Sequence, residues 1–445
     1  MSTFLIKNAD VANFDDLSTS TKDILIEVGR FKKIADKIDK SECPGATLID
    51  AHNMLALPGF VDCHAHSYQT FIKGPLDDLL ITDWLVRLFT FEDDMNEEDY
   101  YYATLLSCLS AMRFGTTTIN EMGGMIHLDT ILQAFEDAGV RLTFGISTTD
   151  IPENEVTPII SVDEALKRSE IVYQKVHGRN HGLMKASVAP AGLPAVSAEM
   201  ATSLKKWANE RGLIYHTHLG EGKMETERVA REYGLGGEAE ALDQLGILDN
   251  KTLLAHSIWL SDSEIELIAK RGAIPVHCPN TNMKIADGIP KIAKMLECGI
   301  PVAMGCDGEA SSGTKDMIRE GKAGSYLQKA ITLDPRVMDA GTTFKMMTIN
   351  GAKALGYDDL GEIKEGYQAD LVLVNMEDDL SLTDRDHRIG NLLYAGTGHA
   401  VDTVFVAGEM KVRNKHLQNF DEQFIISKCN DLIHKLNIRT GYVKE

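Results

Sequence analysis

The sequence predicts an α/β fold: a (β/α)8 TIM-like barrel with a small β-sandwich domain formed from both chain termini. Eight short apolar runs rich in β-branched residues recur along the middle of the chain, and helix-like stretches separate them. Strand-like runs without long helices between them flank this region on both sides. Eight strand–helix units in series are the pattern of a (β/α)8 barrel. We expect the barrel at 57–365, the N-terminal part of the small β-domain at 1–56, and its C-terminal part with a C-terminal helix at 366–445.

The expected barrel strands are short and are bounded by turn residues. They lie at 57–62, 116–120, 140–147, 183–189, 213–218, 251–256, 273–277 and 300–306. The amphipathic segments that predict helices between them include 96–113, 161–177, 197–211, 223–245, 261–271 and 288–298. Gly139, Gly212, Gly272 and Gly299 each come just after a predicted helix and just before a predicted strand. Glycine at such a position suits a helix C-terminal cap.

The two ends of the chain carry a different pattern. Short strand-like runs occur there at 3–7, 23–29, 46–50, 370–375, 402–407 and 409–413. Because these runs flank the barrel at both termini, we expect them to form one small β-domain.

Composition and charge narrow the classes of partner. The chain has 445 residues, 44% of them hydrophobic, and a net charge of −21. This composition is ordinary for a globular protein, and the acidic balance argues against nucleic acid and anionic membranes as partners. No run approaches the ~18 apolar residues of a membrane helix. The N-terminus lacks the pattern of a signal peptide, and the seven cysteines contain no Cys-x-x-Cys pair. We therefore expect a cytoplasmic protein that acts on a small molecule and forms a homo-oligomer.

Histidines gather at the predicted strand ends. His64 and His66 follow the first barrel strand, and side chains at i and i+2 of an extended segment point to the same side. Further side chains of this kind end or follow later strands: His216, His218, His256, His277 and Asp307. Barrel enzymes keep their sites at the C-terminal ends of the strands. Three or four of these groups would hold one Zn²⁺, with Fe²⁺ as the alternative, and leave one position open for water.

Two acids suit proton transfer beside such a metal. Asp307 can both bind the metal and accept a proton from the bound water. Glu221 lies three residues after His218 in HTHLGEG, in the loop above the fifth strand, where a carboxyl can protonate a substrate atom. A bound metal lowers the pKa of one carboxyl and a dry pocket raises that of the other, so the two proton roles separate. The alternative for Glu221 is an acid that stabilises a helix N-terminus.

The motifs LPGFVDCHAHSYQTFIKG, GTTTI, HTHLGE, LLAH, HCPNTNMK and GCDGEAS occur in that order. This series resembles the amidohydrolase superfamily. It is most similar to the branch that contains the triazine hydrolases, the guanine and 8-oxoguanine deaminases, and the methylthioadenosine/S-adenosylhomocysteine deaminases. The resemblance runs from about residue 3 to residue 415 and implies hydrolysis at an aromatic N-heterocycle.

The resemblance implies roles for individual residues. His64, His66, His218 and Asp307 match the metal ligands, and Glu221 matches the acid that shuttles protons. His256 matches the histidine that polarises the attacked group or orients the water, and His216 then supports a ligand or only packs. The resemblance also suggests substrate contacts for Gln69, Trp84, His277 and Asn282, although Gln69 and Trp84 could equally have no contact with substrate.

Two departures from the family pattern bear on the substrate. Adenosine-type deaminases of this branch usually carry an Arg after strand three and a His after strand four. Here those stretches read TFGISTTD and APAGLP, without either residue. We therefore expect a free base or small ring as substrate in place of a nucleoside.

Together, these residues and motifs predict one main function and leave three alternatives open. The first hypothesis is a metal-dependent aminohydrolase that replaces an amine on a small N-heterocycle by hydroxyl and releases ammonia. Glu221, His256 and Asp307 are its catalytic residues. The same scaffold could remove chloride or a thioether from a triazine-like ring, or open a cyclic amide. Outside enzymes, the alternative is a metal-bearing binding protein without turnover.

Overall fold

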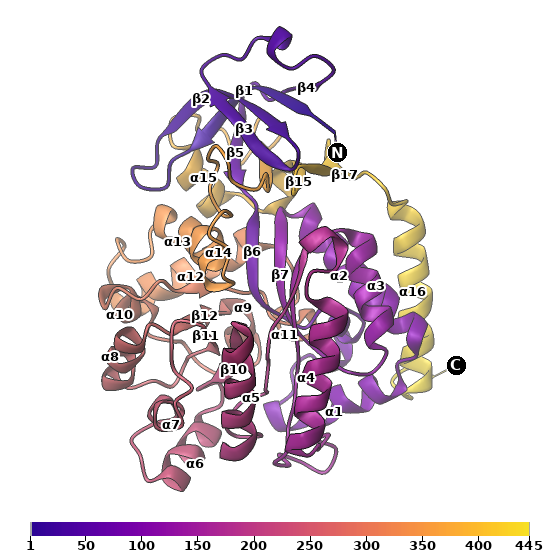
Figure 1. Ribbon diagram of the computed structural model, residues 1–445, viewed down its shortest axis with the longest axis vertical. Helices are drawn as coiled ribbons and strands as arrows, with labels where there is room; N and C mark the ends of the chain where they lie inside the picture. Colours follow the sequence, from indigo (N-terminus) through magenta and orange to yellow (C-terminus); the bar gives the residue numbers. More distant parts are fainter. Residues whose placement is uncertain (1, 445) are drawn as a thin grey trace. The chain divides into compact units, whose positions relative to one another are not determined.

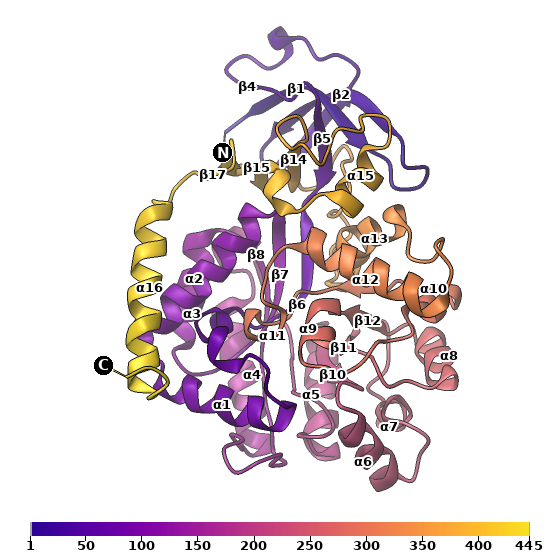
Figure 2. The same ribbon diagram turned by 180° about the vertical axis from the view of Figure 1, so that it is seen from behind.

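The computed structural model describes residues 2–444 and is shown from two sides in Figures 1 and 2. The chain divides into two compact units. One comprises the residues up to Asp62 together with Leu109–Thr118 and Lys315–Glu422. The other comprises Cys63–Cys108, Ile119–Thr314 and the residues from Gln423 onward. Among the described residues, no helix is both long and apolar enough to cross a membrane.

Strands from both ends of the chain form a single nine-stranded sheet. β14 from the C-terminal part pairs antiparallel with β5 from the N-terminal part, and β1 lies between β5 and β2. Phe4, Ile24, Leu371 and Phe405 are among the buried side chains of its core. The strands are β1 (Phe4–Ala12), β2 (Thr19–Glu27), β3 (Arg30–Ala35), β4 (Thr47–Asp50), β5 (Met54–Pro58), β14 (Leu371–Asn375), β15 (Val401–Val406), β16 (Glu409–Arg413) and β17 (His416–Leu417).

Eight further strands form two four-stranded sheets, one in the order β6-β7-β8-β9 and one in the order β10-β11-β12-β13. β8 pairs with β9 in parallel, and the pairs from β10 to β13 are parallel as well. The strands are β6 (Phe60–Ala65), β7 (Thr116–Gly123), β8 (Arg141–Ile146), β9 (Met184–Ala186), β10 (Tyr215–Leu219), β11 (Thr252–His256), β12 (Ile274–His277) and β13 (Ala303–Met304). Each of the eight expected runs contributes one of these strands.

The first expected strand is interrupted at Gly59. Residues up to Pro58 belong to β5 in the nine-stranded sheet, and β6 begins at Phe60. A Cβ atom at Gly59 would lie 2.2 Å from the Thr117 Oγ1 atom, so only glycine fits where the chain passes from one sheet to the next.

Backbone contacts also link the two four-stranded sheets. The Val188 N–H donates to the Ile214 carbonyl at 3.0 Å, and the His216 N–H donates to the Val188 carbonyl at 2.8 Å. At the other edges, the Asp307 N–H donates to the His64 carbonyl at 2.7 Å. Residues that end β6 and follow β13 are therefore direct neighbours.

The helices follow the sequence pattern closely, and Ser161, Ser197 and Ser261 cap three of them by accepting a backbone N–H. The helices are α1 (Ile81–Asp94), α2 (Glu97–Arg113), α3 (Leu128–Ala138), α4 (Val162–Val176), α5 (Ala198–Arg211), α6 (Lys223–Tyr233), α7 (Glu238–Gln244), α8 (Asp262–Arg271), α9 (Pro279–Lys284), α10 (Ile292–Glu297), α11 (Glu309–Ser312), α12 (Met317–Thr332), α13 (Ala340–Met347), α14 (Ile349–Ala354), α15 (Arg388–Ala395) and α16 (Glu422–Arg439). Two expected helices differ from the prediction. The segment 223–245 divides into α6 and α7 because Gly234 ends α6 in a left-handed conformation, and the segment 288–298 shortens to α10, which begins after Pro290.

The predicted glycine caps are present. Gly139, Gly212 and Gly272 are the C-caps of α3, α5 and α8, with φ of 72°, 68° and 78°. Gly299 has a φ of 75° and follows Cys298, the C-cap of α10. These left-handed conformations carry no Cβ penalty in glycine.

The C-terminal helix packs alongside α2, as both views show (Figures 1 and 2). Lys428 forms an ion pair of 2.6 Å with Glu98, and Arg439 pairs with the buried Asp99. These contacts fix α16 to the helix that precedes β7.

Candidate metal centre and active site

Four histidines and two acids meet at the C-terminal ends of β6, β10, β11 and β13. Their candidate ligand atoms form three overlapping groups of three, and within each group these atoms lie within 4.8 Å of one another. The groups are His64, His66 and His218; His64, His256 and Asp307; and His218, Glu221 and His256. The structure thus brings together all six side chains for which the sequence predicts a metal or catalytic role.

Two of these histidines are oriented by backbone carbonyls. The His66 Nδ1 atom lies 2.7 Å from the Met122 carbonyl oxygen, and the His218 Nδ1 atom lies 2.5 Å from that of Ala191. A carbonyl can only accept, so each Nδ1 carries the hydrogen and each Nε2 keeps its lone pair. This second contact is how proteins fix the tautomer of a metal-binding histidine.

His64 is oriented by a chain of buried side chains. Its Nδ1 atom lies 3.0 Å from the His216 Nε2 atom, and the His216 Nδ1 atom lies 3.0 Å from the Asn120 Nδ2 atom. The Asn120 amide also donates to the Cys63 carbonyl at 2.8 Å. His216 therefore holds the His64 ring in place and is not itself part of the cluster of candidate ligands.

Asp307 faces two of the histidines. Its Oδ1 atom lies 3.3 Å from the His64 Nε2 atom and 3.4 Å from the His66 Nε2 atom, and it accepts the Gly308 N–H at 2.6 Å. Burial alone would raise the pKa of Asp307, but the neighbouring histidines, with His64 foremost, hold it well below the usual range. The carboxyl is therefore ionised at neutral pH. Asp307 has a φ of 65°, a strained conformation of the kind that persists at functional sites.

Glu221 and His256 form a second pair at the edge of the cluster. The Glu221 Oε1 atom lies 3.5 Å from the His256 Nε2 atom. The His256 Nδ1 atom lies 3.0 Å from the Asn282 Oδ1 atom. Burial raises the pKa of Glu221, and the charge of Asp307 raises it further. Burial lowers the pKa of His256, but Glu221 and Asp307 outweigh that effect and raise it. The two groups are therefore placed to share and exchange a proton.

Burial keeps His64, His216, His218 and His277 neutral. Burial lowers the pKa of His218 to about 4 and that of His277 to about 3, and it holds those of His64 and His216 well below the usual value. A neutral imidazole is the form that binds a metal. Neutral imidazoles and one ionised carboxylate, with Nε2 atoms directed inward, form a site for a divalent metal.

The four residues with expected substrate contacts differ in their placement. Gln69 is buried next to Gly308, where an added Cβ atom would lie 2.0 Å from its Oε1 atom. Asn282 uses its carbonyl oxygen on His256. His277 ends β12 and is fully buried, and neither of its ring nitrogens has a hydrogen-bond partner among the described residues. Trp84 is buried on α1, and the described contacts do not join it to the cluster.

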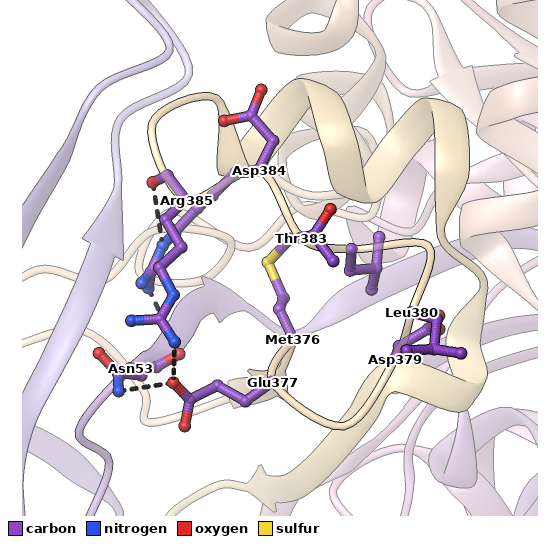
Figure 3. A pocket seen from close by; sticks show the side chains of 10 residues that line it. Asn53, Met376, Glu377, Asp379, Leu380, Thr383, Asp384 and Arg385 are labelled. Carbon is purple, nitrogen blue, oxygen red and sulfur yellow. Dashed lines mark hydrogen bonds and ion pairs between the residues drawn. The ribbon is translucent and has the colours of Figure 1, made fainter.

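A small pocket lies elsewhere, between β5 and the segment that follows β14 (Figure 3). Its volume is about 150 Å³, below the 300–1,000 Å³ of typical ligand sites. Within the pocket, Glu377 accepts a hydrogen bond from Asn53 at 2.7 Å and forms an ion pair with Arg385 at 2.5 Å. These polar side chains of the pocket are therefore bonded to one another. This pocket is separate from the histidine cluster.

A sequence model of the amidohydrolase family matches residues 55–411, most of the chain. The chain belongs to the amidohydrolase family. Among curated relatives, this amidohydrolase is similar to a 5-methylthioadenosine/S-adenosylhomocysteine deaminase from Pyrococcus furiosus. The two are 32% identical over 95% of this chain and 98% of the relative. A 5'-deoxyadenosine deaminase from Methanothermobacter thermautotrophicus is 31% identical over 91% of this chain and 92% of its own.

Solved structures with the same fold cover nearly the whole amidohydrolase chain. An adenosine deaminase from Xanthomonas campestris, with bound zinc, superimposes with a TM-score of 0.89 at 26% identity, over 98% of this chain and 99% of that one. A triazine hydrolase from Arthrobacter aurescens gives a TM-score of 0.90 at 21% identity, over 97% and 100% of the two chains. The latter likeness shows the fold alone.

Two polar residues of this amidohydrolase that shape the site, Asn120 and Asp287, were not predicted from the sequence, and for Asn282 the sequence predicted a substrate contact but not its support of His256. Asn120 ends the GTTTIN run on β7, and this position at a strand end could have indicated it. Asn282 contacts His256 in the structure. The only sequence feature that could have indicated this role is its position in the segment that follows His277-Cys278-Pro279. Asp287, in the loop after α9, has no signal at all, because only the folded loop brings it close to Glu221 and His256.

Proposed function

We propose that this amidohydrolase is a metal-dependent aminohydrolase that replaces an amine on a small N-heterocycle by hydroxyl and releases ammonia. The observation that carries the proposal is the Glu221–His256 pair beside the cluster of His64, His66, His218 and Asp307. Hydrolytic deamination needs a group that accepts a proton from water and another that gives a proton to the ring, and the two acids here have opposite pKa shifts.

We assign the metal to His64, His66, His218 and Asp307, with Zn²⁺ before Fe²⁺ and one ion per chain. The inward Nε2 atoms of His66 and His218 and the ionised Asp307 support this assignment. His256 also lies within reach of the cluster, but its Nδ1 atom contacts Asn282 and its Nε2 atom lies 3.5 Å from Glu221, which favours a catalytic role. A metal bound there would lower the pKa of its water from the bulk value to about 7.

The chain's own residues then divide the proton transfers. The Asp307 carboxylate accepts a proton from the attacking water, for which its low pKa keeps it ionised. The Glu221 carboxyl, whose raised pKa keeps a proton available, protonates the ring nitrogen next to the attacked carbon. His256 stabilises the charge that develops at the attacked position. The proton held by Asp307 is then passed to the amine, which leaves as ammonia, and the proton of the newly added hydroxyl group returns to Glu221.

A nucleoside is the second candidate substrate. The names of the relatives from Pyrococcus furiosus and Methanothermobacter thermautotrophicus favour it. Two local features favour the free base. The loops after β8 and β9 carry no Arg or His at the family positions, and both carboxylate oxygens of Asp150 accept from Ser197, at 2.7 Å from its N–H and 2.6 Å from its hydroxyl. Asp150 is therefore already used to cap the start of α5, which leaves fewer of its acceptor sites for a ribose.

The same reasoning extends to the architecture. We propose that the two four-stranded sheets form one (β/α)8 barrel over 57–365, which the contacts Val188–Ile214 and Asp307–His64 support. We assign 1–56 and 366–445 to the small β-domain, whose shared nine-stranded sheet supports this division. A homo-oligomer and a cytoplasmic location stay predictions from the sequence.

The test is a screen for ammonia release from aminated pyrimidines, purines, pterins and triazines, each as free ring and, where it exists, as nucleoside. We expect turnover of at least one amino-heterocycle by the metal-loaded protein. Release of chloride or thiol in place of ammonia would show that the leaving group differs from the one proposed, while the assignment of the active site would still hold. Absence of any turnover across the screen would favour a binding protein and contradict the proposal.

A further inference from the structure

A buried carboxyl that the proposed chemistry leaves unused lies close to Glu221 and His256. Asp287 belongs to the loop after α9 and is only 8% exposed. Its Oδ2 atom has no hydrogen-bond partner among the described residues. Burial raises the pKa of Asp287 to about 8, and the charges of Glu221 and Asp307 add to this rise while that of His256 opposes it. A carboxyl oxygen buried without a donor is costly, so such groups in proteins usually serve a ligand or a reaction.

The backbone around Asp287 is fixed by neighbours on two loops. Its N–H donates to the Asn282 carbonyl at 3.0 Å, and its own carbonyl accepts the Trp259 Nε1–H at 2.9 Å. Gly288 follows with a φ of 132°, where a Cβ atom would lie 2.9 Å from the Ile258 Cγ2 atom and 3.0 Å from the Trp259 Cζ2 atom. The loop therefore has one shape, and it is an ordered support for the Asp287 side chain.

Asn282 connects this support to the catalytic pair. Its side-chain oxygen contacts the His256 Nδ1 atom at 3.0 Å, and its main-chain oxygen accepts the Asp287 N–H. The same residue thus sets the position of His256 and that of Asp287. A group bound at Asp287 would be held in a fixed relation to His256, which is what orientation of a substrate requires.

We propose that Asp287 is a specificity-determining residue, which accepts a hydrogen bond from an N–H or O–H group of the heterocyclic substrate. This assignment rests on the proposed aminohydrolase function. The ionised Asp307 nearby supports a donor as the group recognised, since the positive end of an N–H or O–H dipole is favoured close to a negative charge, and the carbonyl oxygen of a protonated Asp287 still accepts a hydrogen bond. The substrate class is therefore a heterocycle with a donor besides the amine that leaves.

The experiment compares wild type, Asp287→Ala and Asp287→Asn on pairs of compounds that differ by one donor. The pairs are adenine and 9-methyladenine, cytosine and 1-methylcytosine, and adenosine with its 2′-deoxy, 3′-deoxy and 5′-deoxy forms. Ammonia release gives kcat/KM, and calorimetry gives the affinity for each compound. Asp262→Asn, on an exposed carboxylate that pairs with Lys291 at 2.7 Å, is the matched control.

We expect wild type to prefer the donor-bearing member of one pair by about ten-fold or more, because a polar site rejects an analogue that lacks the matching group. Asp287→Ala should abolish that preference, mainly through KM, and leave the other pairs unchanged. Asp287→Asn keeps an acceptor oxygen and should retain part of the preference, which also covers the case in which the alanine variant fails to fold.

Three results would overturn the assignment. An equal loss on both members of every pair would show that Asp287 only maintains the loop. Wild-type protein that turns over these rings with equal kcat/KM for both members of every pair would show that Asp287 recognises no donor. The aminohydrolase function would then stand without this assignment. Neither binding nor turnover of any ring would remove the proposed function and this assignment together.

Discussion

Glu221 and His256 face each other at 3.5 Å between the Oε1 and Nε2 atoms; the charge of Glu221 raises the pKa of His256, and the charge of His256 opposes the rise that burial causes in the pKa of Glu221. Glu221 comes from the loop after β10 and His256 from the end of β11, so two neighbouring strands place the pair. His256 has a φ of 67°, a left-handed conformation that carries a backbone cost in a residue other than glycine. Strain of this kind at a candidate active site supports a role in chemistry.

Glu221→Gln should retain the metal and lose turnover. The amide is nearly isosteric with the carboxyl but cannot pass protons, and general acid–base groups contribute about 10²–10⁴-fold. Steady-state kcat and metal content of the pure variant check this, with Glu225→Gln on the adjacent helix α6 as the control. If Glu221→Gln kept more than about a third of the wild-type kcat, the deaminase mechanism would be wrong and hydrolysis of a cyclic amide would gain support.

Removal of the metal by a chelator should abolish activity, and one equivalent of Zn²⁺ or Fe²⁺ per chain should restore it. The reason is that the ligand atoms of His64, His66 and His218 converge, and that Asp307 lies 3.3 Å from His64 and 3.4 Å from His66. Elemental analysis measures the metal content of the pure protein. His66→Ala should lower it, whereas the exposed His387→Ala should not. Full activity with far less than one metal per chain would contradict this prediction.

Asn282→Leu should lower kcat by about 10–100-fold, the usual cost of removing a residue that orients a catalytic or ligating histidine. The variant loses the acceptor for the His256 Nδ1–H and leaves the six clustered side chains intact. Asn282→Asp restores an acceptor, now charged, and should shift the pH profile of kcat toward a higher His256 pKa. Asn250→Ala, on an exposed asparagine, is the control. An unchanged pH profile in the aspartate variant would contradict the contact with His256.

The metal-free protein should become less stable as the pH falls below about 6.5. Burial lowers the pKa of His277 to about 3, so the unfolded chain binds a proton there that the folded chain does not. Its share of the stability is present above the unfolded pKa of 6.5 and is lost below it, by about 1.4 kcal/mol at pH 5.5. His64 and His216 act in the same direction, whereas His256, whose pKa is raised, acts in the opposite one.

Urea unfolding with chelator at pH 7.5 and 5.5 measures this loss. His277→Gln should reduce the difference between the two pH values, and His387→Gln on the exposed surface should not. Equal free energies of unfolding at both pH values in wild type would contradict the prediction.

The strands and the histidines could be predicted because both follow local rules. Each strand of the two four-stranded sheets is an apolar run, and each of His64, His218 and His256 lies at the end of one, where the predicted fold class places active sites. The split at Gly59 could not be predicted, because the two runs that it joins are continuous in sequence. The strand β3 was also missed: its sequence, RFKKIA, lacks a continuous apolar run.

The residues that support the site are harder to predict from the sequence than the candidate metal ligands, for a physical reason. Asn120, Asn282 and Asp287 act through hydrogen bonds or charges whose other partners lie on different loops. An asparagine or aspartate in a loop has many possible partners, and only the folded chain selects one. Sequence patterns therefore indicate which atoms could bind a metal, and the structure indicates which atoms hold those side chains in place.

The hydrogen bond from the Asp307 N–H to the His64 carbonyl has a consequence for biosynthesis. The His-x-His pair leaves the ribosome early, whereas the carboxylate that faces it is translated only after all the strands from β7 to β13. A nascent chain that stops short of residue 307 can present imidazoles to a passing cation but cannot complete their surroundings. Tight retention of the ion therefore has to wait until most of the polypeptide has been made, and an incomplete translation product would release it.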